Sequence, residues 1–357
     1  MNRTPHHWAL ACGLALVLTV TACNGDPTEV DPVDNAGPVT LRLGTADDDA
    51  KPGGLAILQF VEQVRTLSDG KLLIYPVWEA AAGAQQWDQV VARMLKDKKV
   101  DLAMIPSRTW DTEGVTSLRA LNAPFLVTSD ALADKIVGTA ELSDELLAGL
   151  DKAGATGLAM MPEGLRHPFG FGRALVSPKA FAGQGIRTAK SDLGDATIRA
   201  FGGKPDDAVG DLYGAGVRSG TLTGAETGFV LSDSLPTAGI AAANVTFTTK
   251  VNTLVANSEV LGGLTPDNQR ILQAAATATR EWVVAHRVPE SAHAAAYCNR
   301  GGKIVNATAV ELRAFDQAVR PLYVELEQDP KTKAMIDRIR TLKQSVRVPP
   351  TGIAVLC

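Results

Sequence analysis

The chain has 357 residues, of which 45% are hydrophobic and 21% are charged, and its formal net charge is −4. These are the values of a globular protein rather than of a disordered or fibrous one. A weakly acidic chain without long charge runs has no electrostatic footprint for nucleic acid, so we exclude that class of partner.

The N-terminal segment has the order of an export signal. A polar start with Arg3 leads into an unbroken apolar run, 9–20, which is too short to span a bilayer, and small residues then precede Cys23. Because it ends in this cysteine and not in an Ala-x-Ala site, the segment resembles a bacterial lipoprotein signal. The resemblance implies a signal peptide at 1–22 and an acylated (palmitate-bearing) Cys23. A plain secretory signal with a chance cysteine is the alternative.

Export constrains the chemistry that we expect. Little ATP or nicotinamide cofactor is found outside the cell, so kinase and dehydrogenase functions are disfavoured and we expect no cofactor. Beyond the signal and Cys23, the remaining cysteines are Cys298 and Cys357. Two cysteines in an exported protein predict a disulfide, with two free thiols as the alternative. No cysteine and histidine spacing typical of a metal site is present, so we expect no metal.

The next elements follow in chain order. Residues 23–38 are polar, acidic and rich in proline and glycine, which predicts a flexible tether. A strand pattern over 39–44 is followed by helical spacing over 54–67, with apolar Leu55, Leu58, Val61 and Val64. Ser-Asp-Gly at 68–70 is typical of a helix end. The pattern continues as a strand over 71–77, a helix over 87–95 and a buried strand over 100–105, which predicts an α/β sheet with crossover connections.

The alternation of helices and strands continues toward the C-terminus. It predicts a helix over 132–153, strands over 157–161 and 185–189, a helix over 193–201 and a strand over 251–256. Thr265 and Pro266 predict the start of a long helix, which Pro289 should kink near its end. Residues 309–344 predict two further helices with a break near Asp329 and Pro330.

Seven short motifs then show a resemblance to a known family. In chain order they are Leu-Arg-Leu-Gly at 41–44, Ser-Asp-Gly-Lys-Leu at 68–72, Lys-Val-Asp-Leu-Ala-Met-Ile at 99–105, Ala-Pro-Phe-Leu at 123–126, Gly-Leu-Arg-His at 164–167, Phe-Ala-Gly-Gln-Gly-Ile-Arg at 181–187 and Leu-Thr-Pro-Asp-Asn-Gln at 264–269. Each is weak alone, but their order and spacing are specific. From about residue 41 to 339 the chain resembles the solute-binding proteins of tripartite ATP-independent periplasmic (TRAP) transporters, of the C4-dicarboxylate-binding DctP type.

The resemblance implies a two-lobed periplasmic-binding-protein fold of type II-like α/β architecture, with a ligand cleft between the lobes and a long helix spanning both. We expect lobe I at 39–162 with a return segment at about 246–265, lobe II at 163–245, the spanning and C-terminal helices at 266–345, and a tail at 346–357. In function it implies a non-enzymatic, extracytoplasmic monomer that captures a small organic acid and delivers it to TRAP membrane permease subunits. The lipid on Cys23 would anchor it to the outer face of the cell membrane.

Arg187 is the principal candidate for binding. The family arginine at this motif holds the ligand carboxylate, and the residues favour the same reading independently. Arg187 ends a short apolar strand at the sheet edge where α/β proteins bind ligands, and a guanidinium meets a carboxylate with two parallel hydrogen bonds. The alternative is a surface or interlobe salt bridge.

The other candidates are weaker. Arg166 either reaches the ligand or braces the cleft, and we expect His167 beside it to be a structural residue. Candidates from the first lobe are Trp78, Glu79 and the pair Ser107-Arg108, because they follow strands where cleft-lining loops begin. Trp78 could equally be ordinary core.

One departure from the family puts the ligand in doubt. Where the family has Glu-Asn-Pro, with an asparagine that contacts the ligand, this chain has Thr227 and Gly228 after a glutamate. A threonine offers one hydroxyl, whereas an asparagine offers two N–H donors and a carbonyl. Upstream, the family's aromatic wall is missing and Tyr213 is the nearest aromatic residue. The changes predict a remodelled pocket.

Two alternative functions remain open at this stage. A secreted hydrolase is disfavoured because the chain has no Gly-x-Ser-x-Gly, His-Glu-x-x-His or Cys/His nucleophile pattern. A sensory module that signals to a membrane receptor would use the same cleft, and the sequence does not separate sensing from transport.

Overall fold

The computed structural model describes residues 37–346 and 357. The expected signal peptide, the lipidated Cys23, nearly all of the tether and nearly all of the C-terminal tail lie outside the described residues. Residues 38–357 form one compact unit.

Five strands of the described chain form the sheet of the first lobe. Their order is β2 (Leu72–Val77), β1 (Val39–Thr45), β3 (Leu102–Pro106), β9 (Thr248–Asn257) and the first part of β4 (Ala155–Gly170). The pairs β1–β2 and β1–β3 are parallel, as the crossover pattern predicts, whereas β9 runs antiparallel to both of its neighbours. The sheet is therefore mixed.

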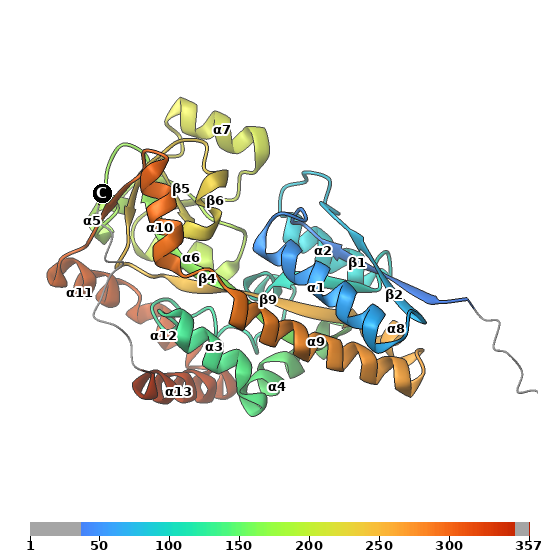
Figure 1. The fold of residues 1–357 in the computed structure, drawn as a ribbon. Coiled ribbons are helices and arrows are strands. Elements are labelled where there is room, and N and C mark those ends of the chain that lie inside the picture. The colour runs from blue at the N-terminus through green and yellow to red at the C-terminus, as the bar shows by residue number, and fades with distance from the viewer. Residues whose placement is uncertain (1–36, 347–356) are drawn as a thin grey trace, which may run out of the picture. The chain divides into compact units, whose positions relative to one another are not determined.

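Strand β3 shows why this sheet needs helices on both faces. All five of its residues are buried. Leu102 and Met104 contact one apolar core, whereas Ala103 and Ile105 contact another, because successive side chains of a strand point to opposite faces. Helices α1 (Pro52–Leu67) and α9 (Pro266–His286) cover the first face, and α2 (Trp87–Lys96), α3 (Asp130–Gly138) and α4 (Ala140–Ala148) cover the second. Figure 1 shows β1 and β2 of this sheet beside α1.

The helix predicted at 54–67 is confirmed as α1, but only Val64 of its four named apolar residues is fully buried. The structure buries Ala56, Ile57, Phe60 and Val64, and leaves Leu55 and Leu58 nearly half exposed. Helix α1 contains more apolar residues than one face can hold, so the spacing alone fits two overlapping stripes.

The second lobe continues the sheet through β4. This strand pairs with β9 as far as Arg166 and with β7 (Gly224–Thr227) from His167 onward. Its other strands are β5 (Gly185–Arg187), β6 (Lys204–Asp206), β8 (Ile240–Ala242) and β10 (Lys303–Val305). The motif residues 164–167 form no turn, because they lie inside β4. A register shift between Pro162 and Gly164 lets the strand bend there without ending.

Helices α5 (Pro178–Phe181), α6 (Asp192–Ala200) and α11 (Ala309–Ala318) pack around a core of phenylalanines, formed by Phe181, Phe201, Phe247 and Phe315. Helices α10 (Glu290–Asn299) and α7 (Gly210–Ser219) pack in two smaller apolar clusters of the same lobe. The kink expected at Pro289 is a full break, where α9 ends at His286 and α10 begins at Glu290. Figure 1 shows α9 beside α1 and α10 beside the second lobe.

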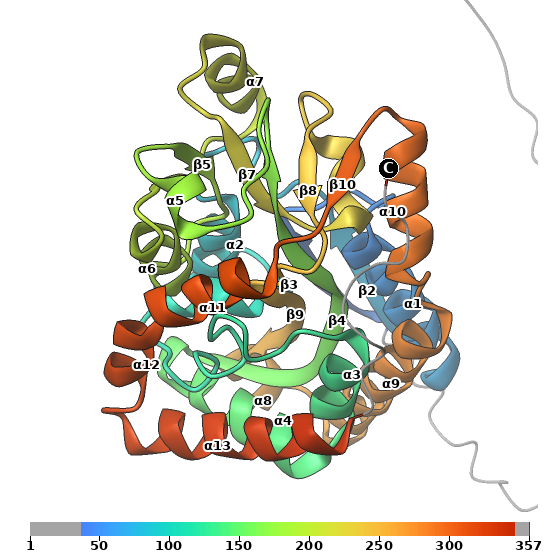
Figure 2. The ribbon, with the colours of Figure 1, turned by 90° about the vertical axis from the view of Figure 1, so that its left-hand side faces the viewer.

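The remaining helices are α8 (Ser258–Gly262), α12 (Arg320–Leu326) and α13 (Pro330–Ser345). Residues 309–344 thus hold three helices where two were predicted, because Pro321 begins a separate helix at its first turn. Helix α13 returns to the first lobe, where Ile336 and Ile339 join the core beneath α3 (Figure 2). Within the described ranges, none of the helices combines the length and the apolar character that crossing a bilayer requires.

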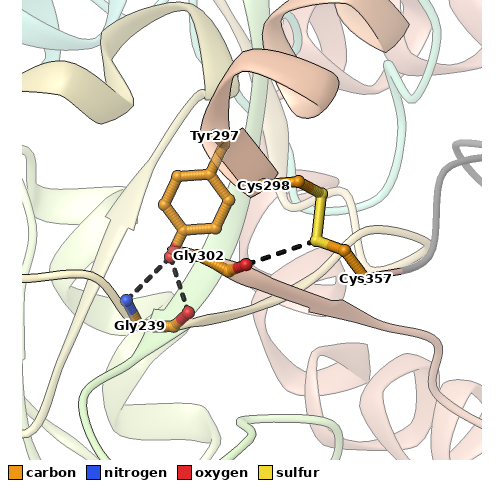
Figure 3. Close-up of a disulfide and its surroundings, with 5 residues drawn as sticks. All are labelled: Gly239, Tyr297, Cys298, Gly302 and Cys357. Atoms are coloured by element: carbon orange, nitrogen blue, oxygen red, sulfur yellow. Dashed lines mark hydrogen bonds between the residues drawn. A yellow bond between two sulfur atoms is a disulfide. The ribbon is translucent and has the colours of Figure 1, made fainter. Parts of the chain in front are cut away.

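A disulfide joins Cys298 of α10 to Cys357, which lies 59 positions further along the sequence, and their Cα atoms are 6.0 Å apart (Figure 3). The neighbouring Tyr297 is buried and its hydroxyl donates to the Gly239 carbonyl oxygen at 2.7 Å. The bridge therefore attaches the last residue to a packed part of the second lobe.

We expect non-reducing mass spectrometry to find Cys298 linked to Cys357. Closing a loop of this length stabilises a fold by about 4 kcal/mol, because it restricts the unfolded chain. A Cys298→Ala variant should therefore lose stability by about that amount in denaturant unfolding. Two free thiols in the purified protein would contradict the pairing.

Candidate functional site

A cavity of about 550 Å³ lies between the lobes, large enough for a small organic ligand. Both lobes contribute to its lining, and the charged or aromatic residues involved are Asp47, Asp48, Lys51, Glu79, Trp87, Asp88, Arg108, Arg166, Arg187, Tyr213 and Lys250. Charged groups of both signs therefore surround the space.

Arg187 occupies the last position of β5, where the strand reaches the cavity. Its Nε donates to the Ala208 carbonyl oxygen at 3.1 Å, which fixes the orientation of the guanidinium. The ring of Trp87 from the first lobe lies 5.7 Å from the guanidinium carbon, and the ring of Tyr213 from the second lobe lies at 5.4 Å. Such cation–π contacts stabilise the charge by about 0.5–2 kcal/mol each.

No carboxylate of the described residues lies within ion-pair distance of Arg187. Burial lowers the pKa of this guanidinium from the ordinary arginine value. An arginine nevertheless stays charged in a protein. A half-buried positive charge without an acidic partner therefore faces the cavity.

The other buried cations of the lining are each paired. Arg108 Nη2 lies 2.7 Å from Asp88 Oδ2, and both belong to the first lobe. Lys250 Nζ lies 2.8 Å from Glu163 Oε1 and 3.5 Å from Asp47 Oδ2. Burial raises the pKa of Asp88, and Arg108 acts in the opposite direction.

Arg166 has a partner in the neighbouring strand. Its Nε lies 2.6 Å from Glu226 Oε1, and its Nη2 donates to Oε2 at 3.4 Å. Arg166 is 5% exposed and Glu226 is 7% exposed, so the pair is desolvated. Burial alone would raise the pKa of Glu226, but Arg166, with smaller contributions from Arg108 and Arg187, holds that pKa below its ordinary value.

Tyr213 and Thr227 line the same cavity. The hydroxyl of Tyr213 is buried without a hydrogen-bond partner among the described residues, and burial raises its pKa to about 12. It is therefore a neutral phenol at physiological pH and can donate a hydrogen bond. Thr227 is buried at the end of β7, next to His167 of β4.

The structure brings together only some of the predicted site residues. Arg187, Arg166, Thr227, Tyr213 and Glu79 line the cavity, together with Arg108. Trp78 and Ser107 do not. Trp78 packs against the core of the first lobe, and Ser107 is buried with its hydroxyl donating to Asn122 Oδ1 at 3.2 Å. Both follow strands as expected, but their side chains point away from the cleft.

Sequence reasoning missed six of the charged or aromatic lining residues, which are Asp47, Asp48, Lys51, Trp87, Asp88 and Lys250. Trp87 and Asp88 begin α2, and Lys250 lies within β9. Strand β9 mixes threonine and asparagine with apolar residues, so Lys250 does not stand out in the sequence as a buried charge. Nothing in the sequence pattern distinguishes the tryptophan that reaches the cleft, Trp87, from the one that packs in the core, Trp78.

His167 has a structural role, as expected. It is fully buried, and its two ring nitrogens lie 3.0 Å from the Val245 carbonyl oxygen and 2.7 Å from Glu290 Oε1. Both nitrogens are thereby occupied, and the ring ties β4 to α10.

Comparison with known families places this fold. The family model described as DctP, bacterial extracellular solute-binding protein family 7, matches residues 43–329. No curated protein sequence matches the chain.

Solved structures share the fold at low sequence identity. A TRAP periplasmic solute binding protein from Ralstonia eutropha H16, with bound (S)-2-acetolactate, has a TM-score of 0.75 at 18% identity, covering 86% of this chain and 99% of that one. A TRAP periplasmic solute binding protein from Roseobacter denitrificans, with bound β-D-glucuronate, has a TM-score of 0.73 at 17% identity, covering 84% and 99%. A sugar acid binding protein from Advenella mimigardefordensis, in complex with galactonate, has a TM-score of 0.73 at 16% identity, covering 87% and 99%.

Proposed function

The chain belongs to family 7 of the bacterial extracellular solute-binding proteins, and on that premise we propose that it captures a small organic acid through Arg187 and delivers it to a TRAP membrane permease. The family consists of solute-binding transport proteins that act outside the cytoplasm. The ligand, the residues that hold it and the permease partner are the parts that we propose.

One observation carries the proposal. Among the residues that the structure describes, Arg187 is the only cation of the cavity lining without a carboxylate at ion-pair distance. A ligand carboxylate would complete the pairing with two parallel hydrogen bonds. Each such bond contributes about 1.5–3 kcal/mol when one partner is charged, so this contact alone can select acids over neutral solutes.

The remaining site residues have subsidiary roles in the proposal. Arg166, held by Glu226, braces the wall behind the ligand, and its unpaired N–H groups remain able to donate. Thr227 and Tyr213 offer hydroxyl groups, and Glu79 lies at the exposed rim. The lobes, 39–162 with 246–265 and 163–245, close on the ligand about β4 and β9, the strands that pass between them.

The ligands of similar structures support an acid. The proteins from Ralstonia eutropha, Roseobacter denitrificans and Advenella mimigardefordensis hold acetolactate, glucuronate and galactonate respectively. Each of these molecules carries a carboxylate, which is the group that Arg187 is placed to bind.

We also propose that the protein works as a monomer on a lipid anchor. The apolar run and the small residues before Cys23 support acylation of that cysteine, and the acidic segment 24–38 supports a tether. An anchored capture domain stays near a permease in the same membrane, which raises the effective concentration of one for the other.

Native mass spectrometry of the purified protein, followed by thermal shift against a panel of organic acids, tests the ligand class. We expect a co-purifying acid or a stabilising one, since a ligand at 100 times its dissociation constant adds about 2.7 kcal/mol. Stabilisation by neutral sugars or amines, with no response to any acid, would contradict the proposal.

A further inference from the structure

We infer that the cleft accepts one negative charge only, so that its ligand is a monocarboxylate with an uncharged polar tail and not a dicarboxylate. The inference rests on the proposed function and deepens it, because it concerns the charge of the ligand at the same site. It follows from how the charged groups around the cavity are already paired.

The two other arginines of the cavity lining are neutralised by carboxylates of the protein. Arg108 lines the same cavity from the opposite lobe, but its guanidinium lies 2.7 Å from the buried Asp88 carboxylate. Arg166 is likewise satisfied by Glu226 at 2.6 Å. Neither guanidinium has a free charge to offer to a second ligand carboxylate.

The lysines of the lining are no more available. Lys250 contacts two carboxylates, those of Glu163 and Asp47, so its surroundings are already negative overall. Lys51 lies at the rim, 3.6 Å from Asp233, and its Nζ donates to Ser234 Oγ at 2.9 Å. An exposed ion pair of this kind contributes about 0–1 kcal/mol, too little to hold a buried second charge.

The wall of the cavity contributed by the first lobe also repels a second anion. Asp47, Asp48 and Glu79 all line it, and no cation of the described residues forms an ion pair with Asp48 or Glu79. A dicarboxylate bound to Arg187 would have to place its other end among these acids. A buried charge that lacks a partner costs several kcal/mol, whereas hydroxyl groups can hydrogen-bond to the same carboxylates.

A pair of six-carbon acids of the same length tests the inference by calorimetry at neutral pH. D-gluconate has one carboxylate and a terminal hydroxymethyl group, whereas D-glucarate has a carboxylate at each end. The matched four-carbon pair is D-threonate and tartrate. We expect the wild-type protein to bind the monocarboxylate of at least one pair, and to bind its dicarboxylate partner more weakly by about tenfold or more.

Two variants test whether Asp88 and Glu79 cause the preference for a monocarboxylate over a dicarboxylate. Asp88→Asn removes the acid that pairs with Arg108, so that this guanidinium can meet a second ligand carboxylate. The ratio of the dicarboxylate's dissociation constant to that of the monocarboxylate should therefore fall by about tenfold. Glu79→Gln, at an exposed position where folding is not at risk, should lower this ratio by about two- to threefold. The matched control is Asp267→Asn, which removes the acid of an exposed Asp–Arg pair on α9 and should leave the ratio unchanged.

The outcomes separate this inference from the proposed function. Equal or tighter binding of the dicarboxylates by the wild-type protein would overturn the inference that the cleft accepts one negative charge only. It would leave Arg187 as the carboxylate site. If both Asp88→Asn and Glu79→Gln fold and still show the wild-type ratio of the two affinities, Asp88 and Glu79 are not the cause of the preference for a monocarboxylate. Failure to bind any acid would contradict the proposed function itself, and the inference with it.

Discussion

Replacing Arg187 with alanine should abolish binding of carboxylate ligands and leave the fold intact. The guanidinium is the only cation of the cavity lining without an ion-pair partner in the part of the chain that the structure describes. Losing two charge-assisted hydrogen bonds costs about 3–6 kcal/mol, which weakens binding at least about a hundredfold. Calorimetry with a ligand found for the wild-type protein measures the loss directly.

Two further variants serve as controls. One keeps a positive charge at position 187, and the other removes an arginine outside the cavity. Arg187→Lys retains a positive charge but loses the planar pair of donors, so we expect partial binding. Arg218→Ala removes an exposed arginine from α7 of the same lobe, outside the cavity lining, and should bind as the wild type does. Unchanged affinity in Arg187→Ala, with unchanged circular dichroism, would place the site elsewhere.

Replacing Glu226 with alanine should lower the free energy of unfolding by about 3–5 kcal/mol. The variant leaves the Arg166 guanidinium buried without its partner, and it also removes the acceptor of the Thr188 hydroxyl at 3.2 Å. Denaturant unfolding measures the effect. The matched control is Asp267→Ala in an exposed pair, for which we expect a loss of about 0–1 kcal/mol.

The same pair predicts a dependence on pH. Since Arg166 holds the pKa of Glu226 below 4.5, its ordinary value, the stability from this carboxylate is complete above that value and is lost as the pH falls through the folded pKa. The difference between wild type and Glu226→Ala should therefore be constant near neutral pH and shrink in acid. A difference that grows in acid, or one below 1 kcal/mol at pH 7, would show that the pair is not desolvated as the structure has it.

The sequence predicted the elements of the first lobe well because their signals are local. An almost wholly apolar run such as 100–105 has few structural solutions, and the structure has β3 over Leu102–Pro106. The long strand β4 was harder, since Gly164 and two prolines within it are typical of loops. Only its antiparallel partners β7 and β9, which are far away in the sequence, explain why the strand continues.

Arg187 could be predicted from the sequence because the family motif and the chemistry of carboxylate binding both indicate this residue. Arg187 follows from its place at the end of a strand, and the structure brings it to the cavity. The pairing of Arg108 with Asp88 could not be predicted, because these residues lie on different elements and neither belongs to a motif. Pairings of this kind decide which charge is left for the ligand, and they depend on how the elements within each lobe pack together.

A crystal structure of the protein with a bound acid tests the central claim most directly. Our account predicts the ligand carboxylate on the Arg187 guanidinium, with both of its oxygens within hydrogen-bond distance and the Arg108–Asp88 pair still closed. A carboxylate bound instead by Arg108 or Lys250, with Arg187 free of the ligand, would contradict it.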